Sequence, residues 1–205
     1  MTRVYFVRHA QPEHDWEEDR TRPLTEEGKK DSAIVLEFLK DKKIDAFYCS
    51  PYKRSMDTIA EAADFFTKEI ITDERLRERE KELDGNNHGM FRKRWADHNY
   101  HEEGGESIAM VQKRNIEALN EILSDNTDKD IVIGTHGTAL STILNFYDNN
   151  FGCEDFLRII DWMPYIIELD FESSCNEMEF ECPSYSFKLI GKQEHCYIEK
   201  EFKGK

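Results

Sequence analysis

The architecture of this chain follows from residues 3–10, RVYFVRHA, which lie almost at the start of a sequence of 205 residues. Four consecutive apolar residues, Val4 to Val7, are typical of a buried strand in an α/β protein. The polar pair Arg8 and His9 follows as soon as this strand ends. Functional sites of open α/β sheets form where parallel strands end and their loops begin, so this pair lies where a site is expected.

Strands and helices are predicted to alternate along most of the remaining chain. Thr25 is predicted to cap a single amphipathic helix over residues 28–40. Ser50 is predicted to be the N-cap of the next helix, with Pro51 at its first position. The other elements expected are helical segments over 86–125, with a break at Gly104-Gly105, and over 139–146, and strands over 46–49, 69–72 and 131–135.

The carboxyl-terminal part is expected to form antiparallel strands at one edge of the sheet. Strand patterns occur over 165–171 and 186–190, with a possible third over 177–181. The whole pattern predicts an α/β fold, a three-layer sandwich with a mostly parallel central sheet. A helical insertion over about residues 76–125 is expected to serve as a lid, and residues 1–205 are expected to form one domain.

Composition narrows the class of function. The formal net charge is −15, which disfavours nucleic acid and anionic membranes as partners, because binding them requires clustered Lys and Arg. The five cysteines form no CxxC pair, which is typical of reduced thiols. The sequence has no apolar segment of signal-peptide type and no apolar stretch of about 18 residues, so a cytoplasmic protein is expected.

Three predicted strand ends deliver polar residues to the same edge of the sheet. The first strand ends in Arg8-His9, the second in Ser50-Pro51 with Arg54 one helical turn later, and the third in Thr135-His136-Gly137-Thr138. Two histidines could bind a divalent metal, but a metal site needs carboxylates or thiolates nearby, and the arginines would repel the cation. Two guanidinium groups suit a phosphate, which they can bind through paired hydrogen bonds. The pattern therefore favours an anion site without a metal.

At this point the sequence resembles a known family. RHA at residues 8–10 resembles the RHG or RHA signature of the histidine phosphatase superfamily, which has the phosphoglycerate-mutase-like fold, and the chain is most similar to its phosphatase branch. Five further motifs of the family follow in family order, which makes the match far more specific than the tripeptide alone. They are LTEEG at 24–28, SPYKRSMDT at 50–58, RLRE at 75–78, GGES at 104–107 and THG at 135–137.

The resemblance implies a mechanism and a set of site residues. His9 is implied to attack phosphorus, while Arg8, Arg54 and His136 hold the phosphoryl oxygens. Glu78 is implied to protonate the leaving oxygen and then to activate water. No cofactor and no metal are implied, and the expected partner is a small-molecule phosphate ester. The neighbouring arginines are expected to keep His9 neutral and hence nucleophilic.

Several of these candidate site residues have an alternative interpretation. Glu80 follows Glu78 in a charged run, and Glu78 is preferred on its motif position. Arg54 could instead lie on a helix surface and pair with Asp57. The hydroxyls of Ser50, Thr135 and Thr138 could reach the site, although capping or core roles suit them at least as well. The basic run at residues 92–94 could guide a second anionic group of the substrate or could be an exposed helix face.

Three functions remain open. The first is a metal-independent phosphomonoesterase that acts through a phosphohistidine on His9, on a small phosphorylated metabolite. The second is a cofactor-dependent phosphoglycerate mutase, although Pro12 stands where the mutase branch carries a hydroxyl residue. The third is a phosphate-binding or scaffold protein without catalysis. A homodimer formed through the edge strands is possible.

Overall fold

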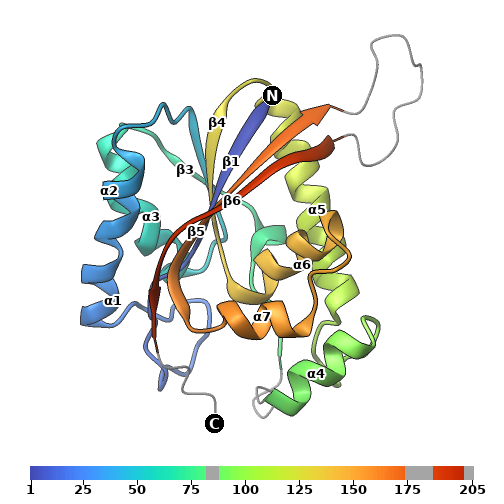
Figure 1. The fold of residues 1–205 in the computed structure, drawn as a ribbon. Coiled ribbons are helices and arrows are strands. Elements are labelled where there is room, and N and C mark those ends of the chain that lie inside the picture. Colours follow the sequence, from blue (N-terminus) through green and yellow to red (C-terminus); the bar gives the residue numbers. More distant parts are fainter. Residues whose placement is uncertain (82–87, 174–186, 201–205) are drawn as a thin grey trace.

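The computed structural model spans residues 1–205 and describes all of them except 82–87, 174–186 and 201–205. Its centre is a six-stranded sheet with the strand order β3-β2-β4-β1-β5-β6 (Figure 1). The first four strands in this order run parallel, and β5 and β6 add antiparallel pairs at one edge. The strands are β1 (Thr2–Arg8), β2 (Ala46–Cys49), β3 (Ile70–Thr72), β4 (Asp130–Thr135), β5 (Trp162–Ser173) and β6 (Phe187–Glu199).

Helices cover both faces of the sheet, which makes three layers (Figure 1). Val4 and Phe6 of β1 pack in the core on the side of α5 and α6, whereas Tyr5 and Val7 pack in the core on the side of α2 and α3. The four apolar residues are therefore buried on both faces, as the run predicted. The helices are α1 (Glu26–Asp31), α2 (Ala33–Leu39), α3 (Lys53–Phe65), the 3₁₀ turn η1 (Glu74–Leu76), α4 (His88–Ala96), α5 (Ile108–Asp125), α6 (Gly137–Tyr147) and α7 (Cys153–Ile159).

The predicted fold class is confirmed, with its mostly parallel sheet, its antiparallel edge and its helical insertion. The insertion contains α4 and α5, separated by a loop that includes Gly104. The strand expected over 186–190 is longer and continues to Glu199. The possible strand over 177–181 lies outside the described residues. The sequence reading missed α7 and η1.

Two local predictions were wrong. The single helix expected over 28–40 is interrupted at Ser32, whose hydroxyl donates to the Lys29 carbonyl at 2.7 Å, while Val35 N–H bonds three residues back to the Ser32 carbonyl. Ser50 is not the N-cap of α3, which begins at Lys53 after Tyr52. The Ser50 hydroxyl instead accepts the Tyr52 N–H at 3.2 Å and contacts a histidine of the site.

Candidate active site

The three strands whose ends were predicted to meet are adjacent in the sheet, in the order β2-β4-β1. Their parallel register aligns Arg8 with Thr135, so the residues that follow these strands share one edge. The rings of His9 and His136 lie 5.2 Å apart between centroids, and Ser50 Oγ lies 2.7 Å from His136 Nε2. The structure therefore brings together the polar residues of all three strand ends.

His9 is held in one tautomer by its own loop. Its Nδ1 lies 2.8 Å from the Ala10 carbonyl oxygen, and a carbonyl can only accept, so Nδ1 carries the proton. Nε2 of the neutral ring then keeps its lone pair. Burial, followed by the positive charges of Arg54 and Arg8, lowers the pKa of His9 well below its usual value. The ring is therefore neutral at physiological pH, in the form required of a nucleophile.

His136 is completely buried at the start of α6. Its Nε2 bonds to Ser50 Oγ, whereas Nδ1 has no hydrogen-bond partner among the residues that the structure describes. Burial, and then the charge of Arg54, lowers the pKa of His136 well below the usual value. An unpaired buried ring nitrogen has a free-energy cost, which a bound ligand with a complementary group would remove.

Arg8 is fixed by backbone carbonyls from the end of α7. Its terminal nitrogens donate to the carbonyls of Ile159 at 2.6 Å and Ile160 at 2.9 Å. Gly137 lies against the guanidinium plane, where a β-carbon would be 3.2 Å from Cζ of Arg8. Burial lowers the pKa of Arg8 to about 10, so the group stays cationic at neutral pH. Arg8 thus supplies a fixed positive charge near both histidines.

Arg54 lies on α3 with only 3% of its surface exposed. Its terminal nitrogens bind the carbonyl of Asp19 at 2.7 Å and the carboxylate of Asp19 at 3.2 and 3.3 Å. The alternative, an exposed Arg54 paired with Asp57, is wrong. Arg54 is buried and pairs with Asp19, whereas Asp57 binds Lys53 at 2.9 Å. Thr58 links the same helix to the loop that carries His9, since its hydroxyl accepts the Ala10 N–H at 2.9 Å.

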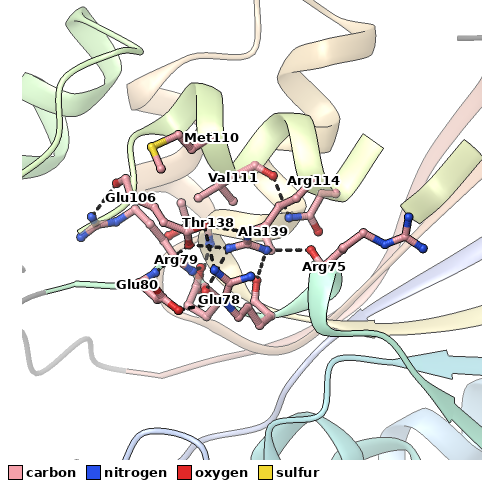
Figure 2. Close-up of polar contacts among 12 residues, drawn as sticks. Arg75, Glu78, Arg79, Glu80, Glu106, Met110, Val111, Arg114, Thr138 and Ala139 are labelled. Atoms are coloured by element: carbon pink, nitrogen blue, oxygen red, sulfur yellow. Dashed lines mark hydrogen bonds and ion pairs between the residues drawn. The ribbon is translucent and has the colours of Figure 1, made fainter. Parts of the chain in front are cut away.

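The two candidate acids differ in their surroundings (Figure 2). One Glu78 carboxylate oxygen accepts the Thr138 N–H at 3.1 Å, beside His136, and the other accepts the Arg79 N–H at 2.8 Å. The Glu80 side chain is 54% exposed and binds Arg77 at 3.1 Å. Only Glu78 of these two is bonded to the segment that carries the second histidine.

The other residues that were considered for the site differ in the contacts they make. Thr138 bonds to Glu78 through its backbone rather than its hydroxyl, and Thr135 Oγ1 is buried with no hydrogen-bond partner among the described residues. The basic run at 92–94 is not one exposed face: Arg94 is buried and binds Glu102 at 2.9 Å, and Arg92 binds Glu154 at 3.2 Å.

Sequence reasoning missed the residues that hold the site residues in place. Asp19 lies in a polar loop with no pattern of its own, and it contacts Arg22 at 3.1 Å as well as Arg54. Glu106 belongs to the GGES motif, to which the sequence alone assigns no function. Arg114 resembles an ordinary polar residue of an amphipathic helix. Nothing in the spacing of these residues shows that they lie beside the site.

Comparisons with known proteins found relatives of this chain. A sequence profile described as the histidine phosphatase superfamily (branch 1) matches residues 4–160. Phosphoserine phosphatase 1 of Hydrogenobacter thermophilus is 27% identical over 157 residues, which are 66% of this chain and 71% of that protein. The 2,3-bisphosphoglycerate-dependent phosphoglycerate mutase of Thermoplasma acidophilum is 43% identical over 53 residues, 26% of either chain.

Solved structures share the fold at low sequence identity. Phosphoserine phosphatase of Entamoeba histolytica superposes with a TM-score of 0.69 at 20% identity, covering 94% of this chain and 96% of that one. A mycobacterial glucosyl-3-phosphoglycerate phosphatase gives a TM-score of 0.68 at 17% identity, covering 91% and 96%. Within the described ranges, no helix has the length and apolar character needed to cross a membrane.

Proposed function

Because this chain belongs to branch 1 of the histidine phosphatase superfamily, we propose that it is a metal-independent phosphomonoester hydrolase that works through a phosphohistidine on His9. The observation that supports this most directly is the state of His9. Its proton is held on Nδ1 by the Ala10 carbonyl, and its charged form is disfavoured by burial and by two arginines. The ring therefore presents a basic nitrogen beside cationic groups that suit a phosphate.

The reaction we propose has two steps. In the first, His9 Nε2 bonds to phosphorus as the ester oxygen leaves, and Glu78 gives that oxygen a proton. In the second, the Glu78 carboxylate takes a proton from water, which attacks the phosphohistidine and releases inorganic phosphate. Arg8, Arg54 and the unpaired Nδ1 of His136 are proposed to bind the phosphoryl oxygens. The two arginines take the place of a metal, whose charge they would repel.

The substrate we propose is a small phosphorylated metabolite. Two of the similar proteins are named as phosphoserine phosphatase and glucosyl-3-phosphoglycerate phosphatase, so esters of carboxylated alcohols are the first to test. The alternative is a cofactor-dependent phosphoglycerate mutase, which the short match to such an enzyme keeps in view. A mutase would require a bisphosphate and would transfer phosphate between substrates rather than release it.

The test is the release of inorganic phosphate from phosphoserine, 3-phosphoglycerate and p-nitrophenyl phosphate with chelator in excess. We expect release by the wild type and none by His9→Ala. His101→Ala is the matched control, because this histidine is exposed and bonds the neighbouring Glu102 carbonyl. If the wild type releases no phosphate from any ester, the phosphatase proposal is wrong. Transfer that requires a bisphosphate would support the mutase instead.

A further inference from the structure

The segment that carries Glu78 is irregular. The 3₁₀ turn η1 ends at Leu76, and residues 77–81 belong to no helix or strand. Such a segment has no ladder of hydrogen bonds of its own, so the position of Glu78 must be set by contacts with other parts of the chain. Figure 2 shows the contacts that Glu106 and Arg114 make with this segment, in addition to the bond between Thr138 and the Glu78 side chain.

Arg114, on α5, binds the backbone of Glu78 and of the residues before it. Its Nη1 donates to the carbonyls of Arg75 and Arg77, each at 2.7 Å, and its Nη2 donates to the carbonyl of Glu78 itself at 3.1 Å. Nε and Nη2 also form a two-pronged ion pair with Glu106, at 2.9 and 2.7 Å. All three guanidinium nitrogens are therefore engaged, in the planar arrangement that only arginine offers.

Glu106 closes the other side of the segment. Its Oε2 accepts the Glu80 N–H at 2.9 Å, and its backbone N–H donates to the Glu80 carbonyl at 3.0 Å. The side chain of Arg77 adds an ion pair to Oε1 at 3.0 Å. Burial alone would raise the pKa of Glu106, but the hydrogen bonds from Arg114 and from the Glu80 N–H outweigh it and lower the pKa. The carboxylate therefore stays ionised and remains paired with Arg114.

The contacts of the Glu78 side chain show what this arrangement achieves. Its carboxylate accepts the Thr138 N–H and so links the segment at 77–81 to the start of α6. A shift of the backbone at Glu78 would break this bond and move the carboxylate away from the histidines. Displacements of about 1 Å caused by changes outside the reacting groups can cost about 10²-fold in rate.

We propose that Arg114 and Glu106 form a clamp that positions Glu78 for proton transfer to the leaving group, so that Arg114 is a positioning residue of this enzyme. The inference rests on the proposed phosphohistidine function, and it assigns a role to two residues outside the proposed phosphate-binding set. It predicts a specific kinetic signature. Loss of the clamp impairs the step that uses the Glu78 proton and spares a reaction that needs no such proton.

Leaving groups separate these cases. An alkyl ester such as phosphoserine expels an alkoxide and needs the proton, whereas p-nitrophenyl phosphate expels a stabilised phenolate. The ratio kcat/KM covers the steps from free enzyme and substrate up to formation of the phosphohistidine, so it includes this proton transfer and leaves out the later hydrolysis. Glu78→Gln should lower kcat/KM for the alkyl ester by about 10²–10⁴-fold and should affect the aryl ester much less.

Arg114→Lys keeps the positive charge but cannot span the three carbonyls and Glu106. We expect it to lower kcat/KM for the alkyl ester by roughly 10²-fold and to change the aryl ester far less. When the change is added to Glu78→Gln, the remaining kcat/KM should hardly fall, because Arg114 acts through an acid that is already missing. Glu106→Gln removes the charge of the clamp at constant size, and it provides the same test if Arg114→Lys does not fold.

Arg3→Lys is the matched control. Arg3 also pairs with two carboxylates, Glu168 at 2.9 Å and Asp170 at 2.8 Å, but it lies at the opposite end of β1 from the site. This variant should change both esters by the same factor or neither. Equal losses for both esters in Arg114→Lys and Glu106→Gln, or an undiminished effect of Arg114→Lys in the Glu78→Gln background, would overturn the clamp.

Failure of the underlying function gives different results. If His9→Ala keeps the wild-type kcat/KM, the phosphohistidine mechanism is wrong, whatever the leaving-group pattern of the other variants. If His9→Ala is inactive but Glu78→Gln treats both esters alike, the acid is wrongly assigned, and the clamp proposal is wrong with it.

Discussion

At the scale of single residues, the chemistry depends on how each histidine shares its protons. His9 has its Nδ1 proton bound by the Ala10 carbonyl, and His136 has one nitrogen bonded to Ser50 and the other unpaired. Both rings are buried next to arginines that oppose a further positive charge. The site therefore holds two neutral imidazoles beside buried arginines, and their different hydrogen bonds suit different roles.

The charge state of these histidines can be measured directly. In a long-range ¹H–¹⁵N NMR titration from about pH 7.5 to 5.5, the signals of His9 and His136 should remain those of neutral imidazole, whereas a free histidine titrates near about 6.5. His9 should show the tautomer protonated on Nδ1. Spectra of His9→Ala and His136→Ala would assign the signals. Titration of either ring near the free value would contradict the electrostatic picture of the site.

At the scale of elements, the loop after β1 is closed by the start of α1. The Thr25 N–H bonds to the Gln11 carbonyl at 3.0 Å, Pro12 forms a bridge with Leu24, and the Thr25 side chain caps α1 by accepting the Gly28 N–H at 2.8 Å. Gly28 packs so closely on Gln11 that an added β-carbon would overlap its backbone oxygen. The glycine of the first-helix motif is thus required by a contact between two backbones.

Gly28→Ala tests this contact. Alanine would normally stabilise a helix by about 1 kcal/mol relative to glycine, but here the overlap with Gln11 should outweigh that gain. We expect a net loss of about 1–3 kcal/mol in the free energy of unfolding, measured by urea denaturation. Gly152→Ala is the control, because the nearest atom to a β-carbon there is 4.0 Å away. A Gly28→Ala variant more stable than the wild type would show that the loop at Gln11 can move to accept the methyl group.

At the scale of the whole molecule, the chain builds a cationic site inside a strongly acidic protein. The formal net charge is −15, yet Arg8 and Arg54 are buried at the carboxyl ends of β1 and β2. Their charges are held by backbone carbonyls and by Asp19, not by the distribution of surface charge. The arginine charges next to His9 are thus opposite in sign to the net charge of the molecule.

Burial of two neutral histidines also makes global stability depend on pH. The folded state lowers the pKa of both histidines. Below about pH 6.5 the unfolded chain therefore takes up protons that the folded chain cannot. The free energy of unfolding is thus unaffected by these histidines above about pH 6.5 and decreases as the pH falls below it. Each can contribute a loss of up to about 1.4 kcal/mol per pH unit. Urea midpoints between about pH 6.5 and 5 should therefore fall with pH.

The double variant His9→Gln, His136→Gln isolates this contribution. It should flatten the pH dependence of the urea midpoint in the same range, whatever its effect on the midpoint at neutral pH. The same slope in wild type and variant would assign the acid sensitivity to other groups, such as the paired carboxylates.

The pattern of residues was sufficient for the architecture and for the cationic side of the site. Strand runs, helical periodicity and the ordered motifs predicted the sheet, its two covered faces and the meeting of Arg8, His9, Arg54 and His136 at one edge. These properties follow from local sequence and from the rule that neighbouring parallel strands end on the same side. The break at Ser32 and the late start of α3 could not be predicted, because single hydrogen bonds within a turn determine them.

Only the tertiary structure decided which side chains hold the site in place. Asp19, Ser50, Glu106 and Arg114 come from a loop, a strand end, the segment before α5 and α5 itself, and their partners are remote in sequence. The sequence favoured Glu78 over Glu80 on motif position alone, and the bond from Glu78 to the start of α6 appears only in the structure. Local periodicity carries no information on such contacts, because they exist only after the sheet has brought distant segments together.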